Sequence, residues 1–79
     1  MILRYHLSGS LVFEMQATAV PPVGTKVIFR MLQRKKGIEQ GALVSAIIQG
    51  EPLAPVYDYS KGEQPIVFID LDEFEELTS

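Results

Sequence analysis

The strongest pattern in the sequence is the run Leu11-Val12-Phe13-Glu14-Met15-Gln16-Ala17-Thr18-Ala19. Its odd positions are all apolar, and its even positions are mostly polar. Successive side chains of a strand point to opposite faces, so this period of two predicts a half-buried β-strand whose odd positions face the core. Residues 2–7 alternate similarly, and Ser8-Gly9-Ser10 between the two segments has the composition of a short turn. The two segments therefore predict a β-hairpin.

Three further segments, at residues 26–32, 42–49 and 66–71, are rich in Val, Ile and other apolar residues and predict strands. Proline, glycine and polar residues separate them. Proline cannot donate to a strand ladder, and glycine permits a positive φ, so these separators predict corners and loops. Residues 56–65 predict an irregular connection with one short extra strand or turn.

The C-terminal residues 72–77 predict a short helical turn, because Phe74 and Leu77 are three positions apart and would face inward together. No segment keeps a 3.6-residue period over three turns. The sequence therefore predicts a single all-β domain over residues 1–79. The expected fold is a small antiparallel barrel of five to six strands, in which closure removes exposed strand edges.

Composition narrows the possible functions. The chain has 79 residues, 47% of them hydrophobic and 22% charged, as is typical of a folded domain. It has no cysteine and one histidine, which excludes a disulfide framework, a thiolate zinc site, a cysteine nucleophile and a multi-histidine metal site. The longest nearly apolar run, residues 42–48, is far shorter than the about 20 residues of a membrane-spanning helix. We therefore expect a cytoplasmic protein without membrane association, cofactor or evident small-molecule substrate.

The later strands are apolar on both faces, which implies that both faces are covered. Ile28 and Leu32, for example, lie opposite the face of Val27, Phe29 and Met31. Two explanations fit this pattern: the curled sheet and its connections cover both faces, or a partner does.

The sequence therefore favours a non-enzymatic interaction or assembly module that binds a protein partner or itself as a homo-oligomer. The candidate binding residues are Ile28, Leu32, Tyr57 and Tyr59. The two tyrosines suit an interface, because each combines apolar area with a polar hydroxyl. The alternative is a turn in which one tyrosine packs onto the barrel.

Charge is strongly segregated along the chain, although the net charge is only −3. Five of the seven basic residues lie within eleven positions that contain no acid: Lys26, Arg30, Arg34, Lys35 and Lys36. Five of the ten acids lie within seven positions: Asp70, Asp72, Glu73, Glu75 and Glu76. The basic hairpin 26–36 offers a second function, nucleic-acid binding through phosphate contacts. The alternative is a solvated loop that keeps the hairpin soluble, with pairing to the acidic C-terminal segment as a further option.

Two groups of residues suggest chemistry, and each also has a simpler interpretation. Asp70, Asp72 and Glu73 are candidate ligands for a divalent cation, or a solubilising strand end. His6 is a candidate acid or base with Glu14, or a surface histidine on the polar face of a strand. No nucleophile elbow or recognisable triad accompanies them, so we expect no enzymatic activity.

The run Val20-Pro21-Pro22-Val23-Gly24-Thr25-Lys26-Val27-Ile28-Phe29 resembles a corner of SH3-like small barrels. There, a Pro-x-x-Gly-x-x-Val run precedes a strand, a polar hairpin and a second strand rich in Val and Ile. Here the matching positions are Pro21, Gly24 and Val27, followed by residues 41–48. The resemblance covers about a third of the chain and extends to uncharacterised bacterial and phage proteins of this size. It implies a small barrel and an interaction role, and it carries over no catalytic residue.

Overall fold

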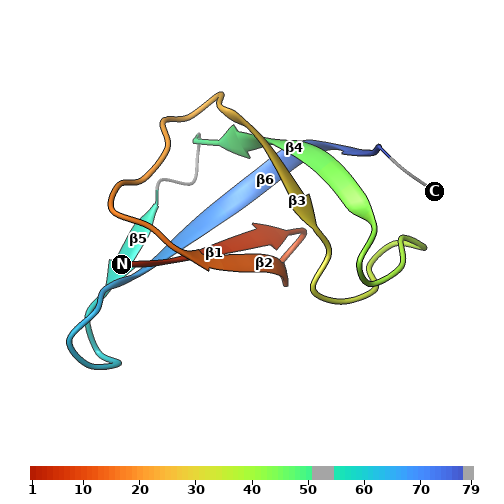
Figure 1. Ribbon diagram of the computed structural model, residues 1–79. Helices are drawn as coiled ribbons and strands as arrows, with labels where there is room; N and C mark the ends of the chain where they lie inside the picture. Colours follow the sequence, from red (N-terminus) through yellow and green to blue (C-terminus); the bar gives the residue numbers. More distant parts are fainter. Residues whose placement is uncertain (51–54, 78–79) are drawn as a thin grey trace.

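The protein is described by a computed structural model that covers residues 1–50 and 55–77. Within these residues it consists of strands, turns and loops, without a helix (Figure 1). The six strands are β1 (Ile2–Leu7), β2 (Ser10–Gln16), β3 (Lys26–Arg30), β4 (Leu43–Gln49), β5 (Val56–Asp58) and β6 (Ile66–Glu76). The prediction of an all-β fold is therefore confirmed.

The long strand β6 organises the sheet. Its first half pairs in parallel with β1 on one edge and antiparallel with β5 on the other. Its second half pairs antiparallel with β4. The full strand order is β2-β1-β6-β4-β3, with β5 beside β6. β2 and β3 lie at the two ends of this order and are therefore edge strands of the sheet.

The sheet is mixed, so the prediction of a purely antiparallel barrel was wrong for one strand pair. β1 and β6 run parallel, with Ile2 opposite Ile66 and His6 opposite Asp70. The alternation of apolar residues places side chains on faces but carries no information about which strand lies alongside or in which direction. The pairing of the first and last strands is decided by closure of the core.

The predicted helical turn at residues 72–77 was also wrong, because β6 continues through Glu76. The register passes from Ile47 opposite Asp72 to Ser45 opposite Glu75, which leaves two residues of β6 against one of β4. This is a β-bulge, and Glu73 within it has φ of 51°. The bulge turns the Phe74 side chain against the core. The inward orientation of Phe74, which the sequence explained by a helical turn, is therefore produced by a bulged strand.

A second bulge corrects the predicted faces of β2. Tyr5 lies opposite Phe13 and His6 lies opposite Leu11, so Val12 is the extra residue. Val12 is fully buried, although its even position predicted the polar face. Beyond the bulge, Met15 lies opposite Leu3 and is 41% exposed. The simple alternation therefore identified the strand correctly and its buried face only in part.

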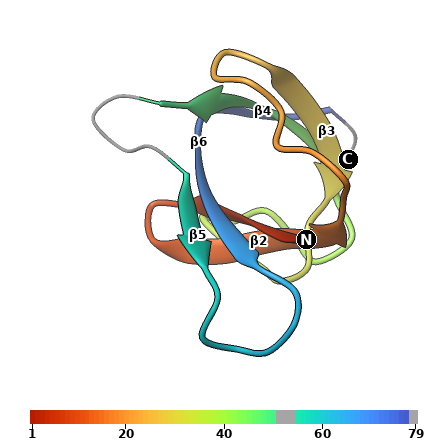
Figure 2. The ribbon, with the colours of Figure 1, turned by 90° about the vertical axis from the view of Figure 1, so that its left-hand side faces the viewer.

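The sheet curls into a half-barrel, so that its concave face encloses the core (Figure 2). The two edges meet at one point, where the Leu32 N–H donates to the Val12 carbonyl oxygen at 2.9 Å. Three rings, those of Tyr5, Phe13 and Phe29, pack together with centroid separations of 5.3 to 6.5 Å. Burial of these apolar side chains is the main stabilising contribution. The architecture is compatible with that of small β-barrels.

Residues 20–25, the Pro-Gly corner, lie between β2 and β3 and form backbone hydrogen bonds to β4. Gly24 has φ of 89° and donates its N–H to the Ile48 carbonyl oxygen at 2.8 Å. Val23, next to it, lies against Gly50 so closely that a Cβ at position 50 would overlap the valine side chain. This region therefore needs glycine at two positions. Gly24 is needed for its positive φ, and Gly50 is needed because a Cβ there would overlap Val23.

Candidate interaction surface

The convex side of the half-barrel carries one face that combines apolar and charged residues. Directly paired residues share a face, so the registers of β3, β4 and β6 define its members. The outer face, as we call it, consists of Lys26, Ile28 and Arg30 of β3, Leu43, Ser45 and Ile47 of β4, and Asp72 and Glu75 of β6. The strand β4 forms its centre line.

The centre line of the outer face consists of two half-buried apolar side chains with a buried serine between them. Leu43 and Ile47 are half-buried, and Ser45 between them is only 2% exposed. Ile28, beside Ser45 on the edge strand, is 60% exposed. The curl therefore covers the concave face of the sheet with the chain itself, while Ile28 on the convex face keeps most of its side chain in solvent.

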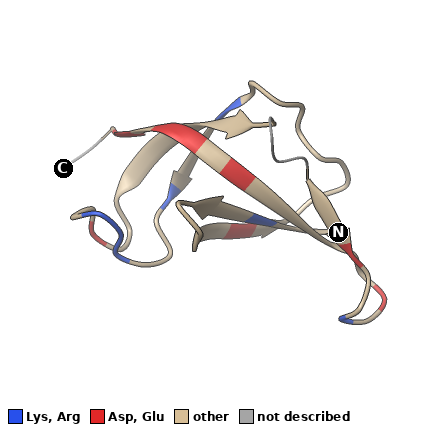
Figure 3. Ribbon diagram, turned by 180° about the vertical axis from the view of Figure 1, so that it is seen from behind, with Lys and Arg blue, Asp and Glu red and all other residues tan. Residues whose placement is uncertain are grey.

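Charges of opposite sign flank this apolar centre. Lys26 and Arg30 are exposed on β3, and Asp72 and Glu75 are exposed on β6 (Figure 3). Within residues 1–50 and 55–77, the ion pairs are Arg4 with Glu14 and Arg34 with Glu39, so these four side chains form none there. Arg30 does donate one hydrogen bond, to the Gly41 carbonyl oxygen at 3.0 Å.

The four predicted partner-binding residues are exposed, but they fall on two separate surfaces. Ile28 and Leu32 lie on β3 and just after it, with Leu32 44% exposed. Tyr57, on β5, is 47% exposed and lies opposite the buried Val67, on the concave side of the sheet. Tyr59 follows in the next turn and is 67% exposed. Because β4 and β6 separate β3 from β5, the two pairs do not form one patch.

Tyr59 is presented by a local motif that the sequence reasoning missed. Asp58 Oδ1 accepts hydrogen bonds from the Ser60 N–H at 2.9 Å and from Ser60 Oγ at 2.6 Å. These two hydrogen bonds hold the pKa of the Asp58 carboxyl below its ordinary value. The Asp-Tyr-Ser spacing is the signal that would have identified this turn.

The basic hairpin packs against the first hairpin instead of standing free. Its turn, Lys36-Gly37, and the β1–β2 turn, Ser8-Gly9, both have positive φ at both central residues, as a type I′ turn requires. Lys36 Nζ donates to Ser8 Oγ at 2.9 Å. Lys35 Nζ likewise donates to Ser10 Oγ at 2.7 Å.

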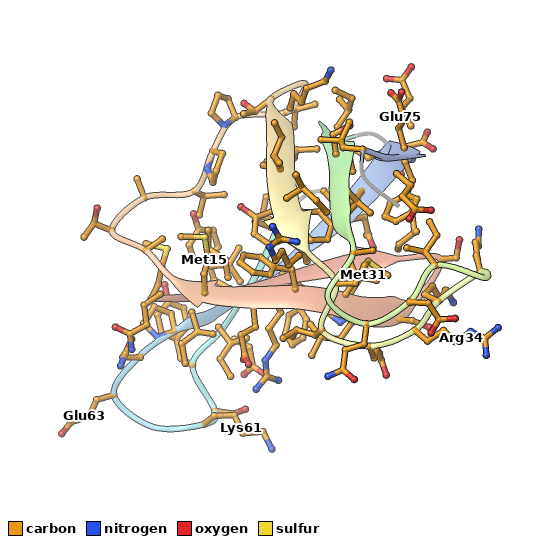
Figure 4. The ribbon with its side chains drawn as sticks, turned by 45° about the vertical axis from the view of Figure 1, so that its right-hand side comes forward. Met15, Met31, Arg34, Lys61, Glu63 and Glu75 are labelled. Carbon is orange, nitrogen blue, oxygen red and sulfur yellow. The ribbon has the colours of Figure 1, made fainter. Side chains whose placement is uncertain are left out.

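The predicted cluster of five cations is therefore divided. Lys35 and Lys36 bind the first hairpin, and Arg34 at the hairpin tip lies 3.4 Å from Glu39 (Figure 4). Lys26 and Arg30 lie on the outer face. The optional pairing of this loop with the acidic C-terminal segment is not seen, because the ion pairs among the described residues are Arg4 with Glu14 and Arg34 with Glu39.

The predicted carboxylates line a pocket of about 660 Å³ between the first hairpin and the bulge of β6. Asp70, Asp72 and Glu73 share its wall with Lys36 and Gln49. Asp72 Oδ1 accepts the Glu73 N–H at 2.9 Å, so one carboxylate oxygen serves the bulge itself. Across the described part of the chain, no group of three or more His, Cys, Asp and Glu side chains is arranged to hold a metal ion.

The structure does not bring His6 and Glu14 together as an acid–base pair. The register of the first hairpin places Glu14 opposite Arg4, whose Nε lies 2.8 Å from Glu14 Oε1. His6 packs its ring against Phe68 with a centroid separation of 5.7 Å, and its Nδ1 lies 3.1 Å from the Arg4 carbonyl oxygen. The arrangement is that of a surface histidine over an aromatic side chain.

The described residues, which contain no helix, hold no helical segment with the length and hydropathy needed to cross a membrane. Comparison with known proteins finds no matching family model, no matching curated protein and no matching solved structure.

Proposed function

We propose that this chain is a non-enzymatic, cytoplasmic interaction module that docks onto another polypeptide through its outer face. The observation that carries the proposal is the 60% exposure of Ile28, which adjoins the half-buried Leu43 and Ile47 of β4. An exposed apolar residue by itself is ordinary. Here it adjoins further apolar surface and is flanked by charges, the usual combination of apolar centre and polar rim in a protein interface.

The same charges weigh against nucleic-acid binding through β3. Neighbouring strands are about 4.8 Å apart, so the acids on β6 lie roughly 10 Å from the cations on β3. That separation is slightly longer than the Debye length at physiological salt, about 8 Å, so the acids are partly screened there and weaken the attraction of Lys26 and Arg30 for a phosphate backbone most at low salt. A protein partner with charges of both signs meets no such penalty.

The corner at Pro21 and Gly24 adds support from the SH3-like resemblance. Gly24 adopts the positive φ that such a corner needs, at 89°. We extend the proposal to an SH3-like barrel, since the resemblance also implies an interaction role. The outer face, rather than Tyr57 and Tyr59, is the surface to which we assign it.

Site-specific photocrosslinking in intact cells tests the proposal. The photoreactive residue p-benzoylphenylalanine replaces Ile28 in one variant and Glu63 in a control, because Glu63 is exposed in the loop at the opposite end of the molecule (Figure 4). We expect one dominant protein adduct at position 28 and none of that mass at position 63. The adduct should disappear when Arg30→Glu is introduced into the same chain.

Two outcomes would overturn the proposal. The first is the same adduct pattern at both positions, which would indicate random collisions. The second is an adduct at position 28 that nuclease removes, which would favour nucleic acid as the partner of β3.

A further inference from the structure

We infer that the partner of the outer face is a second copy of this chain. The inference rests on the proposed interaction function and identifies its partner. The outer face carries both signs of charge in separate rows, cations on β3 and acids on β6, with the half-buried Leu43 and Ile47 of β4 between them. A surface of this kind is complementary to itself in one particular orientation.

That orientation has a twofold axis in the interface, parallel to β4. Rotation about such an axis keeps each position along the strands and reverses the order of the strands. β4 then packs on β4 of the second copy, and β3 packs on β6. Lys26 comes opposite Asp72 of the second copy, because the two residues already share a cross-strand row through Ile47. By the same rule Ile28 comes opposite Glu75, and Arg30 lies diagonally from that carboxylate. Such an isologous contact makes each pairing twice.

Other ways of joining two copies place like charges together. Antiparallel pairing of two β3 edges about Ile28 puts Lys26 opposite Arg30 of the second copy, and like charges directly opposite each other are destabilising. A twofold axis perpendicular to the strands stacks β3 on β3 with the same result. The cations of β3 thus protect the exposed edge against strand addition by a second copy and leave the face-to-face arrangement.

The size of the outer face sets the expected strength. Three strands about 4.8 Å apart, at about 3.3 Å per residue, give a footprint of at most roughly 15 by 20 Å, because two convex faces approach most closely along β4. This is smaller than the about 800 Å² that each partner contributes to a standard interface. We therefore expect a dissociation constant in the range of about 10 to 500 µM, with affinity that falls as salt screens the charged rows.

Sedimentation velocity of the full chain tests the inference at concentrations from about 10 to 500 µM, in about 50 mM and about 500 mM salt. We expect a monomer–dimer equilibrium that shifts at least about threefold toward monomer in the higher salt. Two charge-reversed variants then test the orientation. One carries Lys26→Glu with Arg30→Glu, and the other carries Asp72→Lys with Glu75→Lys.

Each variant alone should be monomeric, because its two rows then have the same sign. An equimolar mixture should form a heterodimer, because every row again faces one of opposite sign. A control with Lys61→Glu and Glu63→Lys, both exposed in the loop before β6, should dimerise like the unmodified chain. Circular dichroism verifies that every variant keeps its β-sheet spectrum.

The outcomes separate this inference from the proposed function. A monomer at every concentration, together with a crosslink from position 28 to a different protein, overturns the second copy as partner and leaves the interaction module standing. A dimer that neither charge reversal affects overturns the proposed orientation. The absence of both dimer and crosslink overturns both proposals.

Discussion

Lys36 Nζ and Ser8 Oγ lie 2.9 Å apart and join two turns that are 28 residues apart in the chain. Lys35 Nζ donates a second hydrogen bond of the same kind, to Ser10 Oγ at 2.7 Å. These hydrogen bonds attach the long connection between β3 and β4 to the first hairpin. The lysines of the basic hairpin therefore act as structural donors in this fold.

Removal of both hydroxyls tests this role. We expect the double substitution Ser8→Ala and Ser10→Ala to lower the free energy of unfolding by about 1 kcal/mol, since each hydrogen bond contributes about 0.5–1.5 kcal/mol and one of them is exposed. Urea unfolding measures the change. Thr18→Ala, in an exposed bend, is the control and should change stability by less than about 0.5 kcal/mol. Equal stability of all three proteins would contradict a structural role for the lysines.

The bulge of β6 predicts that a glycine is better than the native residue at one position. Glu73 has φ of 51°, a conformation that costs an L-residue roughly 1 kcal/mol and a glycine almost nothing. We expect Glu73→Gly to stabilise the fold by about 0.5–1 kcal/mol. Glu75→Gly, two residues later in regular strand, should destabilise it by a similar amount. Thermal unfolding distinguishes the two, and destabilisation by both would argue against the bulge.

The bulge of β2 predicts opposite sensitivities for two neighbouring positions. Val12→Ala should cost about 2 kcal/mol, because Val12 is fully buried and the substitution leaves a cavity. Met15→Ala should cost less than about 1 kcal/mol, because Met15 is 41% exposed. Simple alternation along β2 predicts the reverse order. Chemical denaturation of the two variants therefore determines which register the protein adopts.

The contact between Val23 and Gly50 predicts that a smaller residue at position 23 restores the stability lost when position 50 gains a side chain. Gly50→Ala should destabilise the fold by about 1–3 kcal/mol, because the new methyl group overlaps the valine side chain. Val23 is 59% exposed, so Val23→Ala alone should have a small effect. The double variant should recover most of the loss. A double-mutant cycle by urea unfolding measures this coupling, and additive effects would show that the two residues do not touch.

The Asp58 turn predicts a specific pH dependence. Hydrogen bonds from Ser60 lower the pKa of Asp58 below its ordinary value in the folded protein. A lowered carboxyl pKa contributes stability that is present above the unfolded pKa and is lost as pH falls through the folded pKa. Ser60→Ala should raise the pKa of Asp58 and reduce this acid-dependent loss. NMR titration of the Asp58 carboxyl carbon in both proteins measures the shift. An unchanged pKa in the variant would show that the Ser60 hydroxyl is not a cause of the shift, because the backbone N–H of residue 60 still donates to Asp58.

Local patterns were sufficient to predict most of the strands. The alternation in residues 26–32 correctly placed Phe29 and Met31 in the core, because the side-chain period of a strand is set by its own backbone. The short turn at Ser8-Gly9 was likewise predictable, since its glycine readily adopts positive φ. The exposed state of Ile28 was not predictable, because an apolar residue on the second face of a strand is covered only if another part of the molecule reaches it.

The candidate surface was predictable only as separate pieces. The cations at positions 26 and 30 and the acids at positions 72 and 75 are evident as charge segregation along the chain. The sequence alone did not place them on one face of three neighbouring strands, because that requires knowing that β4 lies between β3 and β6. The prediction of a helical turn at the C-terminus even removed Asp72 and Glu75 from the sheet.

The amino-acid sequence by itself therefore specified an all-β chain, the approximate positions of its main strands, and two oppositely charged segments. These properties depend on residues close together in the chain. Tertiary structure decided the parallel pairing of β1 with β6, the bulges at Val12 and Glu73, and the position of Leu43 and Ile47 between the two rows of charge. The physical reason is that strand order and register are chosen by burial of the whole core, so residues far apart in sequence jointly determine which face each side chain finally occupies.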